Sequence, residues 1–469
     1  RVVWIVPEVN LADWEGCQPA PWLPGGGSAR WHAELAQGRT ALAAGRTEET
    51  LAAAAAMRDL DGGLVPTAHR LEVRAHLALG QEAAAATAAR GEIAAQHYPL
   101  LAHLAAPQAS PWVQELLRRG GHRHGFSIVD LPEVFAAHGD TALPGRRYFL
   151  DYCHLTVEGI HVAMAAATAA VLSQNGETGE WRRLVETLPP PVVDPSLVAT
   201  AYLGAAIHGA HRLLPLTDAA PLLEFWCGAA LDASPRIADT FLDLARARCA
   251  PVPAVLTGAQ RRNLASSHRL GLQHGWRWDG LDLDVLAALA TALEARGIAA
   301  RERVREDLVA GRGSLERPVD LVETRWLWRP LERFLPEVMA FDDLDRRAFY
   351  RAPWPRSSFA LVTDGAGAVR LRCVLRLPAA GGAARRSVGL EVDGREIARR
   401  AVGSRFERWD LELPAAMMHR GVHRLTLLWP PAPPRGGEAL ALALRRLEEG
   451  LEGDLHPVFG EVFSLEAAR

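Results

Sequence analysis

The sequence predicts a multidomain protein: a partial α/β domain carrying a helical insertion, then a helical middle region and a C-terminal antiparallel β-sandwich. Three observations support this prediction. The chain has 469 residues, enough for several domains. A buried-strand pattern, a polar loop and an apolar helix follow one another around residue 150. Apolar and polar residues alternate repeatedly after residue 350.

Residues 1–27 and 97–175 are assigned to the partial α/β domain. Val2–Val6 reads as a buried strand, and the chain begins at Arg1 inside this pattern, so we expect it to be part of a longer or processed protein. Phe126–Leu131 predicts a second short strand, followed by a brief helix at Pro132–His138. Thr156–Leu172 then predicts a long helix.

Residues 28–96 are rich in alanine and predict a helical insertion. Apolar residues recur at helix-face spacing, and Gly45 and Gly80 mark expected helix ends. Two helix hairpins about 35 residues apart would resemble tetratricopeptide (TPR) repeats. Both a groove for a protein partner and an insert without a binding role fit this pattern.

The remaining two regions differ in their periodicity. Residues 181–345 predict helices, with Pro189, Pro190 and Pro191 as a linker. Residues 350–469 predict the β-sandwich, with Asp393-Gly394 as a hairpin turn. The alternating segments are Val369–Leu377, Val388–Val392, Trp409–Leu413, Leu425–Trp429 and Leu440–Leu444.

Charge and cysteine content exclude several classes of protein. A net charge of -3 argues against nucleic acid or an acidic membrane surface as an obligatory partner. No apolar run reaches the roughly 18 residues that a membrane span needs. The 5 cysteines are scattered without a C-x-x-C pair, which disfavours a disulfide framework or a structural zinc site. We therefore expect a reducing, cytoplasmic compartment.

The segment Phe149–Gly159 carries the clearest chemistry. Asp151 lies three residues before His154 in a loop that precedes a helix, so a tight turn can bring carboxylate and imidazole together. The carboxylate would fix the tautomer of the imidazole, leaving the other ring nitrogen free to accept a proton from a serine hydroxyl. Thr156 is a candidate cap for the helix that follows.

This segment, D-x-x-H-L-T-x-E-G, resembles the last motif block of the SGNH/GDSL hydrolases. The resemblance covers residues 1–14 and 120–172. It implies a flavodoxin-like α/β core and an ester hydrolase without metal or organic cofactor. It also implies that Asp151 and His154 complete a triad with a serine in an N-terminal G-D-S block. These residues contain no G-D-S, so the family's N-terminal blocks are expected to precede Arg1.

The end of the first strand is similar to another block of the same family, G-x-N-D. Asn10 matches the asparagine that donates to the oxyanion, a contact that lowers a barrier by about 3 kcal/mol. Glu8 and Leu11 replace the glycine and the aspartate of that block. An asparagine that merely closes a turn after the strand is the alternative.

Other polar residues offer weaker alternatives. Ser28 follows a glycine run and could be exposed as a nucleophile, but serine is also a common helix N-cap. His122 and His124 have no carboxylate or cysteine at a spacing typical of a metal site, so none is expected there. His208 and His211 lie three residues apart on one predicted helix and are interpreted as packing residues.

We therefore expect an SGNH-like serine ester hydrolase, either an esterase or deacetylase or an acyl-transferring relative. Its substrate would be an O-acyl ester of a small molecule or a carbohydrate, the carbohydrate being inferred from the β-sandwich by analogy alone. The chain as given, without the serine, would be inactive. The alternative is a non-catalytic scaffold whose TPR-like repeats bind protein partners beside a degenerate hydrolase core.

Overall fold

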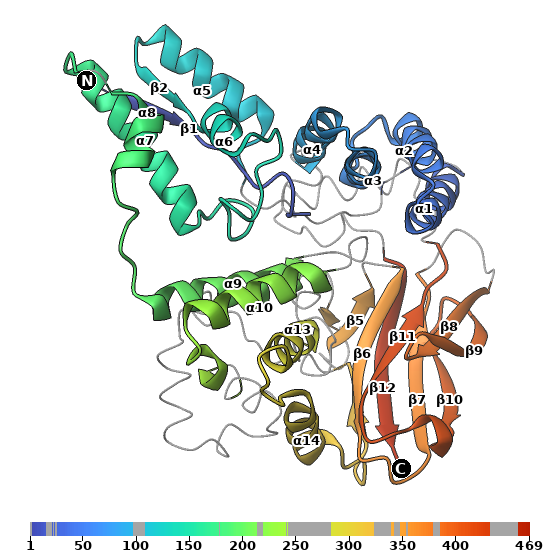
Figure 1. Cartoon of the computed structure of the whole chain (residues 1–469). Helices are drawn as coiled ribbons and strands as arrows, with labels where there is room; N and C mark the ends of the chain where they lie inside the picture. The colour runs from blue at the N-terminus through green and yellow to red at the C-terminus, as the bar shows by residue number, and fades with distance from the viewer. Residues whose placement is uncertain are drawn as a thin grey trace. The chain divides into compact units, whose positions relative to one another are not determined.

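The computed structural model describes residues 2–15, 21, 23, 26–96, 108–177, 179–212, 219–240, 242, 283–322, 339–341, 348–352, 355–378, 385–431 and 458–469. The chain divides into two compact units. The first comprises Arg1–Gln18, Arg30–Asp194 and Arg212–Asp218, and the second comprises Pro19–Ala29, Pro195–His211 and Ala219–Arg469. Both contain helices and strands, which confirms the predicted mixed α and β architecture in its coarse form (Figure 1).

In the first unit, β1 (Val3–Val6) and β2 (Ser127–Asp130) pair in parallel, although the helical insertion separates them in sequence. Both predicted strands are thus confirmed. Side chains alternate along a strand, so neighbouring residues of β2 face opposite sides. Ile128 lies against Gly121 of α5 (Pro111–Arg123), where an added Cβ would approach it to 2.8 Å. Val129 packs into the core on the other side.

That core is formed with the helices that follow β2. These are α6 (Leu131–Gly139), α7 (Val157–Gln174) and α8 (Trp181–Thr187). The first two confirm the predicted helices. Phe135, Phe149 and Val162 are fully buried in this cluster, so the loop before α7 is held by apolar packing as well as by its own hydrogen bonds.

The predicted helical insertion contains four helices. They are α1 (Gly27–Ala43), α2 (Thr47–Asp61), α3 (Pro66–Ala78) and α4 (Glu82–Gln96). Gly45 and Gly80 adopt left-handed backbone angles, with φ of 70° and 68°, as expected of residues just beyond helix ends. Helices α3 and α4 share a core with Val9 and Leu11, which follow β1. The insertion therefore packs directly on the segment that contains Asn10.

The second unit begins with helices, as predicted. They are α9 (Pro195–Arg212), α10 (Ala220–Ala233), α13 (Leu283–Glu294) and α14 (Arg301–Arg312). The prediction of helices alone for residues 181–345 is incomplete, because β3 (Val319–Asp320) and β4 (Met339–Phe341) lie within it. Both are short strands that exist through pairing with β12 and β5 respectively, which a local pattern does not reveal.

Two antiparallel sheets complete the second unit. Their other strands are β5 (Ala348–Ala352), β6 (Arg356–Thr363), β7 (Val369–Arg376), β8 (Arg386–Val392), β9 (Arg395–Val402), β10 (Glu407–Leu413), β11 (Gly421–Leu428) and β12 (Gly460–Ala468). One sheet has the order β10-β7-β12-β5-β4, with β3 on β12, and the other has the order β6-β11-β8-β9. Four of the five predicted strand segments are confirmed, and Leu440–Leu444 lies outside the described residues.

The two sheets meet at an aromatic pair. The rings of Tyr350 in β5 and Phe359 in β6 lie 5.5 Å apart, edge to face, and the Tyr350 hydroxyl donates to Ser357 at 3.0 Å. The predicted hairpin turn is present, since Asp393 and Gly394 have φ of 49° and 80° between β8 and β9. None of the described helices combines the length and the apolar character needed to cross a membrane.

Candidate active site

The D-x-x-H segment forms a tight loop between α6 and α7. Phe149 and Leu155 pair as an isolated antiparallel bridge at its base. Inside the bridge, the Leu150 N–H donates to the His154 carbonyl oxygen at 2.7 Å. This closed backbone brings residues three apart in sequence onto one side of the loop.

Asp151 and His154 are in direct contact in this loop. Asp151 Oδ2 lies 2.7 Å from His154 Nδ1, and Oδ1 accepts the backbone N–H groups of Cys153 at 3.0 Å and His154 at 2.9 Å. A carboxylate can only accept, so Nδ1 carries the proton in this contact. The neutral imidazole then presents a lone pair at Nε2.

The two side chains differ sharply in exposure. The side chain of Asp151 is 8% exposed, whereas that of His154 is 65% exposed. Among the residues that the structure describes, no hydrogen bond reaches Nε2 of His154. The buried carboxylate therefore fixes an imidazole whose second nitrogen is available to a hydroxyl group or to solvent.

The contact with Asp151 also favours the protonated form of the His154 imidazole. The hydrogen bond to Asp151, assisted by the nearby Cys153 thiol, raises the pKa of His154 from 6.5 to about 10. Partial burial opposes this rise, but by less. The loop thus stabilises the imidazolium that forms when His154 accepts a proton.

Thr156 and Gly159 explain the rest of the motif. The Thr156 hydroxyl accepts the Gly159 N–H at 3.1 Å and caps α7, as predicted, while donating to the Arg147 carbonyl oxygen at 2.7 Å. A Cβ at Gly159 would collide with the Tyr148 carbonyl oxygen. The start of α7 therefore requires a hydroxyl at Thr156 and the absence of a side chain at Gly159.

Asn10 holds the same loop from the end of β1. Its side-chain NH2 donates to the Asp151 carbonyl oxygen at 3.0 Å, and its backbone N–H donates to that of Tyr152 at 3.1 Å. Its side-chain oxygen accepts the Asp13 N–H at 2.9 Å, and the residue is 3% exposed. These contacts support a positioning role and the turn-closing alternative. Oxyanion donation by Asn10 stays a prediction.

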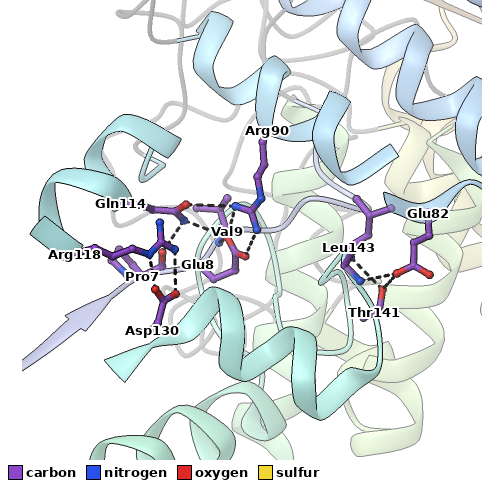
Figure 2. Close-up of polar contacts among 11 residues, drawn as sticks. Pro7, Glu8, Val9, Glu82, Arg90, Gln114, Arg118, Asp130, Thr141 and Leu143 are labelled. Carbon is purple, nitrogen blue, oxygen red and sulfur yellow. Dashed lines mark hydrogen bonds and ion pairs between the residues drawn. The ribbon is translucent and has the colours of Figure 1, made fainter. Parts of the chain in front are cut away.

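Glu8 and Leu11, the two residues that depart from the G-x-N-D block, are both buried. Figure 2 shows Arg90 of α4 reaching toward Glu8 and Gln114 of α5. The fully buried side chain of Glu8 lies 2.8 Å from the Arg90 guanidinium, and Gln114 Nε2 donates to it at 3.2 Å. Leu11 is 1% exposed and belongs to the core shared with α3 and α4. Both residues serve the packing of the helical insertion on the strand end.

Sequence reasoning missed the neighbours that come from distant segments. Arg90 and Gln114 are far from Glu8 in sequence, so no local spacing could reveal the cluster. The ring centroid of Tyr152 lies 5.9 Å from that of His154 and 5.3 Å from that of Trp14. Tyr152 could have been found from its place inside the D-x-x-H motif.

The weaker alternatives fall elsewhere. Ser28 lies in the first turn of α1, is buried, and donates to the Leu23 carbonyl oxygen at 3.3 Å. It belongs to the second compact unit, whereas Asp151 and His154 belong to the first. His122 is exposed, and the His124 ring stacks on Phe126 at 5.6 Å.

Comparisons with known proteins place the chain in no family. No protein-family model matches it, and no curated protein matches it. A solved structure, a ruminal GH26 endo-beta-1,4-mannanase, aligns with a TM-score of 0.20 and 9% identity. That alignment covers 34% of this chain and 26% of the mannanase chain, so this chain spans about a quarter of that structure's length.

Proposed function

We propose that Asp151 and His154 are the acid–base pair of a serine ester hydrolase of the SGNH/GDSL type. The observation that carries this proposal is the 2.7 Å contact between Asp151 Oδ2 and His154 Nδ1, while no residue that the structure describes forms a hydrogen bond with Nε2. Resemblance to the family motif supports it. The nucleophilic serine is expected in the N-terminal G-D-S block of the family, which this sequence does not contain.

The chemistry follows from the atoms that His154 presents. Nε2 accepts the proton of the serine hydroxyl as the serine oxygen bonds to the ester carbonyl carbon. The imidazolium, stabilised by Asp151, then gives that proton to the leaving alkoxide oxygen, and an acyl-enzyme remains. Water or an acceptor hydroxyl resolves the acyl-enzyme by the same proton transfers. Asn10 is the candidate donor to the oxyanion.

The raised pKa of His154 sets the expected pH dependence. A general base must be unprotonated, and His154 with a pKa of about 10 is mostly protonated at neutral pH. We expect kcat/KM to rise as the pH increases through the alkaline range. The proposed substrate is an O-acyl ester of a small molecule or of a carbohydrate.

A non-catalytic scaffold is the second candidate, and one observation favours it. Glu8 and Leu11, which depart from the family block, are committed to the helical insertion, so the strand end serves packing in this chain. In that case the helices α1–α4 would bind a protein partner, and the Asp151–His154 contact would serve only the loop.

The test uses the full product of the gene that encodes this chain. We expect labelling by a fluorophosphonate probe and hydrolysis of p-nitrophenyl acetate. His154→Ala should remove the label and reduce kcat/KM by about 10⁴-fold or more. His122→Ala, which changes an exposed histidine of the same unit, should leave both unchanged. Equal labelling of His154→Ala and the unsubstituted protein would exclude His154 as the base, and no labelling at all would favour the scaffold.

A further inference from the structure

A second group of titratable side chains lies in the four-stranded sheet of the second unit. Asp393 sits in the turn between β8 and β9, His423 lies in β11, and His419 precedes β11 by two residues. One ligand atom from each of the three lies within 4.8 Å of the other two. None of them contributes to the ester hydrolase chemistry.

The buried histidine of this group is held between two acceptors. The side chain of His423 is 0% exposed, and its Nε2 lies 2.9 Å from the His419 carbonyl oxygen. A carbonyl oxygen only accepts, so Nε2 donates, and the neutral imidazole has its lone pair on Nδ1. Nδ1 lies 2.7 Å from Asp393 Oδ2. A lone pair and a carboxylate oxygen that face each other need a cation between them, either a proton or a metal ion.

The other two side chains can complete a coordination shell. The His419 ring is exposed, and its centroid lies 4.1 Å from that of His423. The Asp393 side chain is 43% exposed, and its Oδ1 accepts the Arg424 N–H at 2.8 Å, which orients the carboxylate. Both side chains can therefore shift by small rotations while His423 stays fixed.

We propose that Asp393, His419 and His423 bind a divalent transition-metal ion such as Zn²⁺. Two imidazoles and one carboxylate are a ligand set that suits Zn²⁺, with water in the fourth position. A histidine ligand commonly donates its other ring N–H to a backbone carbonyl, and the contact between His423 Nε2 and the His419 carbonyl has this form. Tetrahedral bonds of about 2.0–2.2 Å place two ligand atoms about 3.4 Å apart. The partly exposed Asp393 carboxylate would therefore move back from its 2.7 Å contact with His423 to admit the ion, and the exposed His419 ring would turn toward it.

Two arginines near this group, Arg305 and Arg420, are paired with glutamates, so they do not compete with a metal ion for the Asp393 carboxylate. The stem of Arg305 in α14 would lie 3.4 Å from a Cβ at Gly421, beside the group. Its guanidinium is paired with Glu302 and lies 3.7 Å from Glu306, which also accepts from Arg420 at 3.0 Å. The Asp393 carboxylate therefore remains available to a cation.

The experiment uses the whole chain carrying Cys153→Ser, so that the thiol near His154 does not compete for metal. After treatment with a chelator, we expect titration with Co²⁺ to give d–d absorption without thiolate charge transfer, and Zn²⁺ to displace the Co²⁺ at one equivalent. Bound Zn²⁺ should raise the Tm because it binds the folded state.

Two substitutions identify the ligands. His419→Ala removes an exposed ligand, and Asp393→Asn keeps a residue that tolerates the left-handed backbone. Each should weaken Zn²⁺ binding by about tenfold or more while the circular dichroism spectrum stays unchanged. His122→Ala should bind Zn²⁺ as the parent chain does. Equal Zn²⁺ affinity in all four chains, or no binding in the parent chain, would overturn the proposal and leave a proton as the cation between Asp393 and His423.

Discussion

Asn10 holds the loop that carries Asp151 and His154, and substitutions can test this positioning role separately from the proposed oxyanion role. Asn10→Ala removes the buried donor to the Asp151 carbonyl and the acceptor for the part-buried Asp13 N–H. We expect the free energy of unfolding to fall by about 1–3 kcal/mol, measured by chemical denaturation. The His154 imidazole should also lose its fixed position relative to Asp151.

A conservative substitution provides the control. Asn10→Asp keeps an acceptor for the Asp13 N–H but places an acceptor against the Asp151 carbonyl, so it should disturb the loop more than the turn. Stability in Asn10→Ala equal to that of the parent chain would contradict the positioning role.

Among the residues of the site, local spacing predicted the Asp151–His154 contact but did not predict the Glu8–Arg90 ion pair. Asp151 and His154 lie in one turn, so their contact follows from sequence separation and loop geometry alone. The Glu8–Arg90 ion pair joins segments that only the packing of the insertion brings together. The motif residues could therefore be read from the sequence, whereas the residues that support them could not.

Among the elements, α7 is capped at its N-terminus by the hydroxyl of Thr156. Thr156→Ala removes both the cap that accepts the Gly159 N–H and the donor to the Arg147 carbonyl. We expect a loss of about 1 kcal/mol in the free energy of unfolding. Thr87→Ala is the matched control, because Thr87 is an exposed residue of α4 whose hydroxyl donates only within its own helix. An equal loss in both variants would show that the cap at Thr156 contributes nothing of its own.

The strands show why periodicity predicts some elements and not others. Strand β7 alternates buried and outward-facing residues, and its pattern is visible in the sequence. Strand β6 is buried at every position after Arg356, so it offers no alternation. The two residues of β3 form a strand only because β12 pairs with them. Strands defined by their partners therefore escaped the sequence analysis.

At the scale of the molecule, the helical insertion and the strand pair form one compact unit. We expect Arg90→Ala to remove the cation from the buried Glu8 carboxylate, which still accepts from Val9 N–H and Gln114, and to cost about 1–3 kcal/mol. Faster hydrogen exchange should then appear in α4 and in β2 together. Arg119→Ala removes a partner from the exposed pair with Glu115 and should change stability by less than about 1 kcal/mol. Exchange that rises in α4 alone would show that the insertion unfolds independently.

The most direct test of the central claim is the NMR titration of the His154 imidazole in this chain. The pKa of His154 should be near 10 and should fall toward 6.5 in Asp151→Asn, which removes the charge that favours the imidazolium. Because the pKa in the folded chain is the higher one, the contact stabilises the fold fully below about pH 6.5. This contribution is lost as the pH rises through about 10. A His154 pKa near 6.5 in the unsubstituted chain, unchanged by Asp151→Asn, would contradict the account.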